Sequence, residues 1–316
     1  MTAPPDPPEP LPGAVQRLRE ARRRARSALV EPAPPTPRDP VPPPGRAGRN
    51  LPAAVGVGLV LLALVAATLF VRREAFVALV VLATGGALWE LARAVAQRGI
   101  AVPLPPLWVG AVGIAVAAWV GGAPAMLMAF VLTAGGVFLW RVLDGGGLAA
   151  VRDAAAGIFA AAYVPYLAGF AVLLLRMEDG AWLVATFLLV AIANDTGGYA
   201  AGVLLGRTPM APSISPKKSW EGLAGSVLLA AAVGVVLTTA ALALPWWVGA
   251  GLGVAAVAAA TTGDLAESLL KRDLGLKDMG SLLPGHGGIM DRLDSMLASA
   301  PVCYVILGAA TGGLTF

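Results

Sequence analysis

Long apolar runs, separated by short polar breaks, fill most of the chain after residue 50. Each run approaches the roughly 20 residues that a helix needs to cross a bilayer. The pattern therefore predicts an all-α, polytopic integral membrane protein with about nine transmembrane helices. The expected helices cover residues 51–71, 75–96, 104–121, 124–141, 154–175, 181–202, 223–243, 246–263 and 292–313.

The composition agrees with this fold class. Hydrophobic residues make up 57% of the chain and charged residues only 13%, whereas soluble domains carry about 25% charged residues. The single cysteine, Cys303, lies inside an apolar run. It excludes a disulfide framework and a cysteine-rich metal site, and it predicts a small buried side chain. No P-loop and no dinucleotide-binding fingerprint occurs, so neither soluble nucleotide-binding fold is indicated.

Residues 1–50 form a separate segment, rich in Pro and Arg and poor in aromatic residues. Such a composition cannot bury enough apolar surface to offset chain entropy, so a disordered basic tail is predicted. The net charge of +4 comes from this tail, and it gives no indication of a nucleic-acid partner. Residues 51–316 are expected to form the transmembrane domain.

The basic tail also predicts the orientation in the membrane. By the positive-inside rule, it places the N-terminus in the cytoplasm, and we expect the protein in the cell membrane. Counting spans from there puts the polar stretches Arg207–Glu221 and Asp264–Asp291 on the cytoplasmic side. Arg72 and Arg73 fall on the outer side and are exceptions to the rule.

A polar segment, Gly263–Ser295, interrupts the apolar pattern near the C-terminal end. It contains five Asp, one Glu, two Lys, two Arg and the only His of the chain. Ionisable groups at membrane depth are costly unless they are paired or hydrated, so such a segment indicates a function. This segment and Arg207–Glu221 together hold all four lysines of the chain.

Carboxylates recur at helical spacing at both ends of this segment. Asp264, Glu267 and Lys271 share one face if the preceding helix continues. Asp291 and Asp294 repeat the spacing at the start of the last predicted helix. Two helix ends that carry carboxylates and face each other can hold a hard cation such as Mg²⁺.

A glycine-rich turn, Pro284–Gly288, connects these two ends. Its glycines would let backbone N–H groups approach a phosphate, and the basic residues nearby would pair with phosphate oxygens. Carboxylates, cations and this turn favour phosphoryl or nucleotidyl transfer. The alternative is a solvated loop between helices with internal salt bridges.

The two polar stretches carry a long ordered pattern of residues. The main run consists of Ser268, Lys271, Arg272, Lys277, Asp278, Gly280, Leu283, Pro284, His286, Gly287, Gly288, Ile289, Asp291, Arg292, Leu293 and Asp294. Upstream lie the block Ser215–Gly222 (SPKKSWEG) and the group Asn194, Asp195, Thr196 and Tyr199. In order and spacing, over about residues 190–300, this pattern resembles the phosphatidate cytidylyltransferases, also called CDP-diacylglycerol synthases. Gly197 and Gly198 stand where a bulkier residue is expected, and Arg207 stands where Lys is common.

The resemblance implies that CTP and phosphatidate give CDP-diacylglycerol and pyrophosphate with Mg²⁺ as cofactor. It also implies a homodimer. The implied metal ligands are Asp264 and Asp291, with Asp294, Asp195 and Glu221 as further carboxylates. The implied catalytic residues also include Lys271, Arg272 and His286, the last shaping the turn, contacting a phosphate or acting as a base. The implied substrate-binding residues are Lys217, Lys218, Ser219, Glu221, Lys277, Asp278, Gly287, Gly288, Arg292 and Asp195.

Two other functions remain open from the residues. A CTP-dependent polyprenol or phytol kinase would share the architecture and the nucleotide but transfer a γ-phosphoryl group; the complete main run argues against it. A transporter would place its charges near mid-membrane at helix breaks, whereas here they gather at one end of the predicted helices.

One further acid lies outside these stretches. Glu90 is a lone carboxylate within the second predicted helix, with Arg93 one turn later. We expect a structural pair between them rather than a second site.

Overall fold

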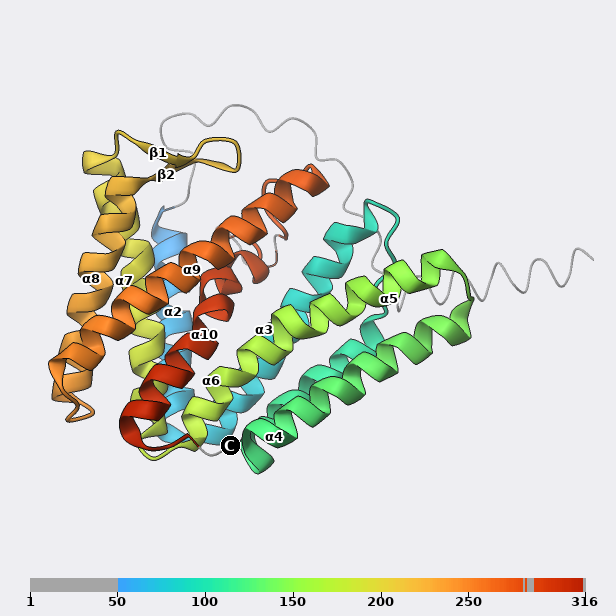
Figure 1. The fold of residues 1–316 in the computed structure, drawn as a ribbon, viewed down its shortest axis with the longest axis horizontal. Helices are drawn as coiled ribbons and strands as arrows, with labels where there is room; N and C mark the ends of the chain where they lie inside the picture. Colours follow the sequence, from blue (N-terminus) through green and yellow to red (C-terminus); the bar gives the residue numbers. More distant parts are fainter. Residues whose placement is uncertain (1–50, 281, 283–286, 315–316) are drawn as a thin grey trace, which may run out of the picture.

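The computed structural model describes residues 51–280, 282 and 287–314, and within them the chain is almost entirely helical (Figure 1). The helices are α2 (Leu51–Val71), α3 (Arg73–Ala96), α4 (Leu104–Asp144), α5 (Leu148–Ala161), the π-helical turn η1 (Ala162–Tyr166), α6 (Leu167–Arg176), α7 (Gly180–Leu205), α8 (Trp220–Ala240), α9 (Trp246–Leu274) and α10 (Met290–Thr311). Two short strands, β1 (Pro209–Ala211) and β2 (Ser215–Ser219), form an antiparallel hairpin between α7 and α8. The all-α prediction is confirmed, and the hairpin is an addition inside a predicted loop.

The number of spans is close to the prediction. Within the part of the chain that the structure describes, seven helical segments are long and apolar enough to cross a membrane. One of them, α4, is divided into two helical arms, because Gly122 between them adopts a left-handed φ of 73°. A Cβ on Gly110 would strike Thr133, so the two arms lie antiparallel against each other. These arms correspond to the two spans predicted on either side of residues 121–124.

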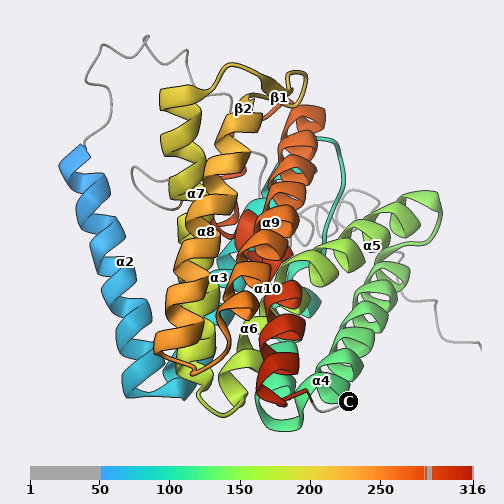
Figure 2. The ribbon, with the colours of Figure 1, turned by 60° about the vertical axis from the view of Figure 1, so that its left-hand side comes forward.

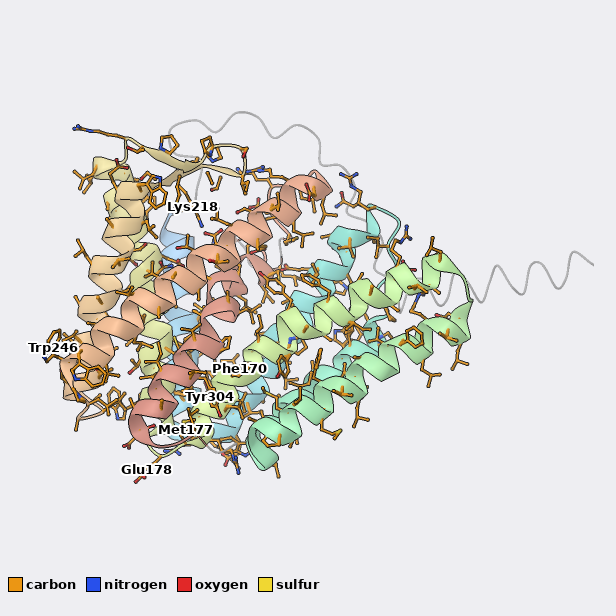
Figure 3. The ribbon with its side chains drawn as sticks, in the orientation of Figure 1. Phe170, Met177, Glu178, Lys218, Trp246 and Tyr304 are labelled. Carbon is orange, nitrogen blue, oxygen red and sulfur yellow. The ribbon has the colours of Figure 1, made fainter. Side chains whose placement is uncertain are left out.

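Successive helices run up and down, so that alternate connections meet at the same end of the bundle (Figures 1 and 2). The β1–β2 hairpin and the C-terminal end of α9 lie together at one end. Lys218 lies at that end, whereas Met177 and Glu178 lie at the opposite one (Figure 3). The prediction that both polar stretches face one side therefore agrees with the arrangement of the helices.

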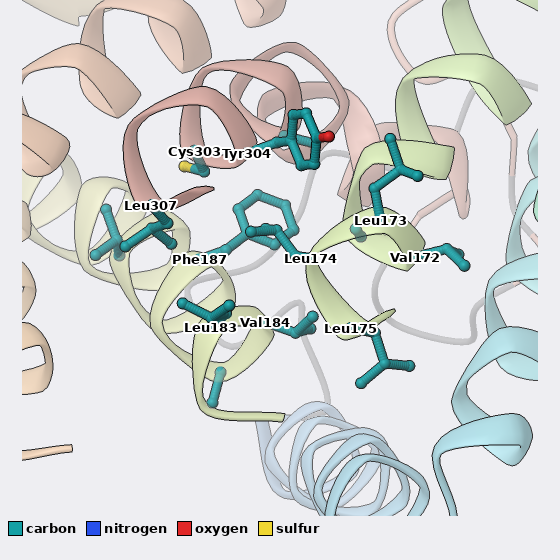
Figure 4. Packing of buried hydrophobic residues seen from close by; sticks show 14 of the residues in the cluster. Val172, Leu173, Leu174, Leu175, Leu183, Val184, Phe187, Cys303, Tyr304 and Leu307 are labelled. Atoms are coloured by element: carbon teal, nitrogen blue, oxygen red, sulfur yellow. The ribbon is translucent and has the colours of Figure 1, made fainter. Parts of the chain in front are cut away.

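Two apolar clusters hold the helices together. The larger one joins α6, α7 and α10, where Leu174, Leu183 and Leu307 are fully buried (Figure 4). Cys303 lies in it as a buried free thiol, as predicted. The smaller cluster joins α3, the first arm of α4, η1, the end of α9 and the start of α10. It therefore connects an N-terminal helix to the segment that carries the signature residues.

Glycines allow α7, α8 and α9 to approach closely. A Cβ on Gly197 would lie 2.5 Å from the carbonyl oxygen of Gly225 on α8, and one on Gly198 would lie 2.6 Å from Ser226 Oγ. A Cβ on Gly249 of α9 would strike the backbone of Gly234 on α8. Small residues at such contacts are the usual means by which membrane helices approach. This packing is the physical reason for the two glycines that depart from the family pattern.

A first prediction concerns the α8–α9 contact. Gly249→Ala should lower the melting temperature in detergent by several degrees, because overpacking costs about 1–3 kcal/mol. Gly251→Ala on the same helix is the matched control, since a Cβ there meets nothing within 4 Å. That control should leave the melting temperature unchanged or raise it slightly, because Ala has the higher helix propensity. Equal melting temperatures for the two variants would contradict the close contact.

Candidate active site

The β1–β2 hairpin leads directly into α8, and Ser219 marks the junction. Its backbone is extended, with φ −126° and ψ 157°, and its Oγ accepts a hydrogen bond of 3.1 Å from the N–H of Gly222. This is the geometry of a helix N-cap. The predicted substrate-binding role of Ser219 therefore comes with a local structural role.

Glu221, in the first turn of α8, fastens the base of the hairpin. Its carboxylate accepts hydrogen bonds from the backbone N–H groups of Arg207 and Thr208, both at 3.2 Å, and from Thr208 Oγ1 at 2.9 Å. Glu221 is half-buried, and it is not among the residues that line the cleft described next. The structure thus places this predicted carboxylate at the hairpin rather than beside the other acids.

A polar cleft of about 240 Å³ opens between α7, α8, α9 and β2. Three of the predicted basic and acidic residues from different elements meet there: Asp195 of α7, Lys218 of β2 and Asp264 of α9. Other polar residues that line it are Asn194, Tyr199, Lys217, Ser219, Ser226 and Thr261. Segments that are about 70 residues apart in the sequence therefore form one site.

Ion pairing organises this cleft. Lys218 Nζ forms an ion pair with Asp264 Oδ2, and both side chains remain partly exposed. Asp264 also accepts a 3.3 Å hydrogen bond from Ser268 Oγ, one turn later on α9. Asp195 accepts a 2.9 Å bond from Asn194 Nδ2. A cation and two carboxylates thus face a cleft that is open to solvent.

A second group of charges lies where α9 and α10 meet. Lys271 Nζ is 3.0 Å from Asp291 Oδ1 and 3.4 Å from Glu267 Oε1. The oxygens of Asp291 also accept the backbone N–H groups of Met279, at 3.1 Å, and Gly288, at 3.0 Å. Asp291 therefore ties the loop that follows α9 to the start of α10.

Two further acids lie beneath these groups. Glu267 is 1% exposed and Asp294 is 9% exposed. Lys271 is the ion-pair partner of Glu267. Asp294 accepts a 2.6 Å hydrogen bond from the N–H of Ser295. The carboxyl groups of Glu267 and Asp294 interact electrostatically. Asp294 also interacts electrostatically with Asp264 and with Asp195.

The remaining predicted residues lie around this centre. Arg272 donates from Nε to the carbonyl oxygen of Ile214, at 3.3 Å, and so connects α9 to the hairpin. Exposed side chains are those of Lys277, Asp278 and Arg292. Gly287 has a left-handed φ of 85°, and Gly288 is buried. His286 lies outside the described residues.

The oxygen donors are of the type that Mg²⁺ prefers, because it takes one or two carboxylates together with waters and substrate phosphates. Among the described residues, no three His, Cys, Asp or Glu side chains are grouped closely enough to enclose a metal ion. Asp264 is the accessible candidate, since it faces the cleft. A metal at Asp291 would have to share its oxygens with Lys271 and two backbone N–H groups.

Sequence reasoning missed the part that Glu90 plays. Its carboxylate accepts hydrogen bonds from the backbone N–H of Leu282, in the loop between α9 and α10, and from that of Met290, the first residue of α10. Arg93, the partner expected from spacing, lies over the Trp89 ring at 4.6 Å. The available signal was a lone acid within an apolar helix, but its distant partners could not be read from helical spacing.

Comparison with known proteins explains why these residues occur together. A sequence model of the cytidylyltransferase family matches residues 52–310. The chain belongs to this family. The phosphatidate cytidylyltransferase of Mycobacterium bovis is 40% identical over 300 residues, which cover 91% of this chain and 95% of the relative. That of Mycobacterium leprae is 39% identical over 277 residues, or 83% and 89%. The predicted family resemblance is confirmed, and the matched region extends well beyond residues 190–300.

A second prediction separates the two roles of Ser219. Ser219→Ala should destabilise the protein by about 1 kcal/mol, because the N-cap is lost. Ser219→Asn restores a capping oxygen and should restore the melting temperature. If Ser219 also contacts substrate, the Asn variant should keep a raised KM for CTP or phosphatidate. A normal KM in the Asn variant would limit Ser219 to capping.

Proposed function

We propose that the cleft between α7, α8, α9 and β2, together with the Lys271–Asp291 group, is where this chain transfers the cytidylyl group of CTP to phosphatidate. The protein is a phosphatidate cytidylyltransferase, and its products are CDP-diacylglycerol and pyrophosphate. Its identity of 40% to a phosphatidate cytidylyltransferase over 91% of the chain supports this activity most strongly. The meeting of Asp195, Lys218 and Asp264 in one polar cleft supports the location.

The reaction needs positioning and charge neutralisation rather than a protein nucleophile. A phosphate oxygen of phosphatidate attacks the α-phosphorus of CTP, and the bond from that phosphorus to the bridging oxygen breaks, releasing pyrophosphate. Lys217 and Lys218 lie at the cleft and would neutralise phosphate oxygens as charge builds up on them. Holding the two substrates in line contributes the rest of the acceleration.

Mg²⁺ is the proposed cofactor, and Asp264 is the first residue that would hold it, with Asp195, Asp294 and Asp291 as further carboxylates. When bound, the ion would neutralise the triphosphate and polarise the reacting phosphoryl group. Lys218 is the cation beside Asp264. We propose that Lys218 also binds the triphosphate of CTP, and that Mg²⁺, when bound, would neutralise Asp264.

The lipid would reach the cleft from the bilayer. An apolar cavity of about 420 Å³ lies between α2, α3, α6, α7 and α10. Leu293 and Met296 line it, on either side of Asp294 in the sequence of α10. This cavity could take an acyl chain while the phosphate headgroup enters the polar cleft.

We further propose a homodimer in the cell membrane, with a tail at residues 1–50 that is dispensable for chemistry.

The decisive assay uses purified protein in detergent with Mg²⁺, phosphatidate and CTP labelled at either the α- or the γ-phosphate. The α-label should enter the lipid and the γ-label should leave as pyrophosphate. A kinase would instead place the γ-label in the lipid. Failure of both labels to enter lipid, with folded protein, would overturn the proposed reaction.

A third prediction concerns Asp264 and Asp291. Changing either to Asn keeps the shape and removes the charge, and we expect activity to fall at least about a hundredfold, as for other metal-site losses. Asp273→Asn, on the exposed end of the same helix α9, is the control and should keep normal turnover. Near-normal turnover of a folded Asp264→Asn protein would remove Asp264 as the metal ligand.

A fourth prediction concerns the orientation of the cleft. Single cysteines at Ser213 and Lys277, in a Cys303→Ala background, should react with a membrane-impermeant thiol reagent only from the cytoplasmic side. Glu178→Cys, at the opposite end of the bundle (Figure 3), should react only from outside. The reverse labelling pattern would overturn the proposed cytoplasmic site.

A further inference from the structure

Glu90 is a buried carboxylate that lies about 190 residues before the family signature in the sequence. It lies on α3 and is 1% exposed. Leu91, its neighbour on α3, and Met290, whose N–H it accepts, belong to the smaller apolar cluster. Burying a charge among apolar side chains is costly unless hydrogen bonds compensate for the lost water. Its partners should therefore matter to the protein.

Those partners are two backbone groups, one in the loop between α9 and α10 and one at the start of α10. Glu90 Oε1 accepts from the N–H of Leu282 at 3.3 Å, and Oε2 accepts from the N–H of Met290 at 2.9 Å. Met290 is the first residue of α10, so its N–H has no partner within the helix. Hydrogen bonds to an ionised carboxylate are about twice as strong as neutral ones. One side chain of α3 thus holds both the loop and the start of α10.

Two signature glycines fit against this carboxylate. A Cβ on Gly280 would strike Glu90 Oε1 and Cδ. A Cβ on Gly288 would lie 2.5 Å from Glu90 Oε2 and 2.8 Å from Asp291 Oδ2. The backbone at Gly288 therefore passes between the carboxylates of Glu90 and Asp291, and only glycine fits there.

We propose that Glu90 is a positioning residue of the active site, which fixes the loop that presents Asp291 to the substrates. Asp291 holds Met279 and Gly288 from one side, and Glu90 holds Leu282 and Met290 from the other. Lys271 joins this arrangement through its ion pair with Asp291. An N-terminal helix thereby sets the geometry of the C-terminal signature.

The first test replaces Glu90 with Gln. The amide keeps the size of the side chain but directs an NH₂ group at a backbone N–H, so one of the two hydrogen bonds is lost. We expect the KM for CTP to rise about tenfold or more, as for other residues that orient metal-site groups. Glu74→Gln, an exposed acid of the same helix, is the matched control and should behave as the wild type.

Hydrogen exchange provides a readout that does not depend on turnover. The amides of Leu282 and Met290 should exchange faster in Glu90→Gln and at the wild-type rate in Glu74→Gln. A purely structural role for Glu90 predicts a lower melting temperature with normal KM and unchanged exchange in this loop. That result would overturn the proposal.

A second variant tests the same contact from the loop side and changes no charged residue. Gly280→Ala should displace the Glu90 carboxylate and raise the KM for CTP, and it should lower the melting temperature by several degrees, because the added methyl group overpacks this contact. Glu90→Ala makes room for the added methyl group. The loss of activity in the Glu90→Ala, Gly280→Ala double variant should therefore be about tenfold smaller than the product of the two single losses. Losses that simply multiply, or a normal KM in Gly280→Ala, would show that Glu90 does not position the loop.

Discussion

Carboxylates inside a membrane protein need a compensating partner, and this constraint orders the whole C-terminal half of the molecule. Lys271 lies between Glu267 and Asp291, so α9 and α10 are joined through a charge that neither helix could bury alone. Lys218 of β2 likewise pairs with Asp264 of α9, and so joins the hairpin to that helix. Without these cations, the acids at the helix ends would repel one another, and the cleft between α7, α8 and α9 would not keep its shape.

Hydrogen bonds from backbone N–H groups are the second way in which these carboxylates are stabilised. Asp291 and Glu90 accept them from the loop between α9 and α10, and Glu221 accepts them from the start of the hairpin. Both polar connections are thus held by acids from neighbouring helices. The glycines of the signature make these approaches possible, because a side chain at Gly280 or Gly288 would occupy the space of the accepting oxygens.

The sequence predicted the helices well because their signal is local. Apolar runs of sufficient length specify each span, and the Gly122 turn that divides α4 follows from residues next to each other in the chain. The family was also predictable, since the signature residues occur in the order and spacing typical of it, and the roles of the site residues stay a prediction. The pairing of charges could not be predicted from the sequence. Nothing in the spacing of Asp291 indicates backbone partners at Met279 and Gly288, and nothing in α3 shows that Glu90 faces a loop about 200 residues away. The β1–β2 hairpin was missed because five residues rich in Ser and Lys carry little strand signal.

The close contacts of α7, α8 and α9 also determine how the cleft can respond to its substrates. Gly197 lies against Gly225, and Gly234 lies against Gly249, so main chain touches main chain where most helix pairs interpose side chains. Rotamer changes cannot widen such an interface, since glycine has no side chain to move. The three helices therefore form a stiff wall of the cleft, so that a change in its width falls on the side chains of β2 and of the rim. Under the proposed function, such a wall would hold the nucleotide and the phosphatidate headgroup at a fixed distance from each other.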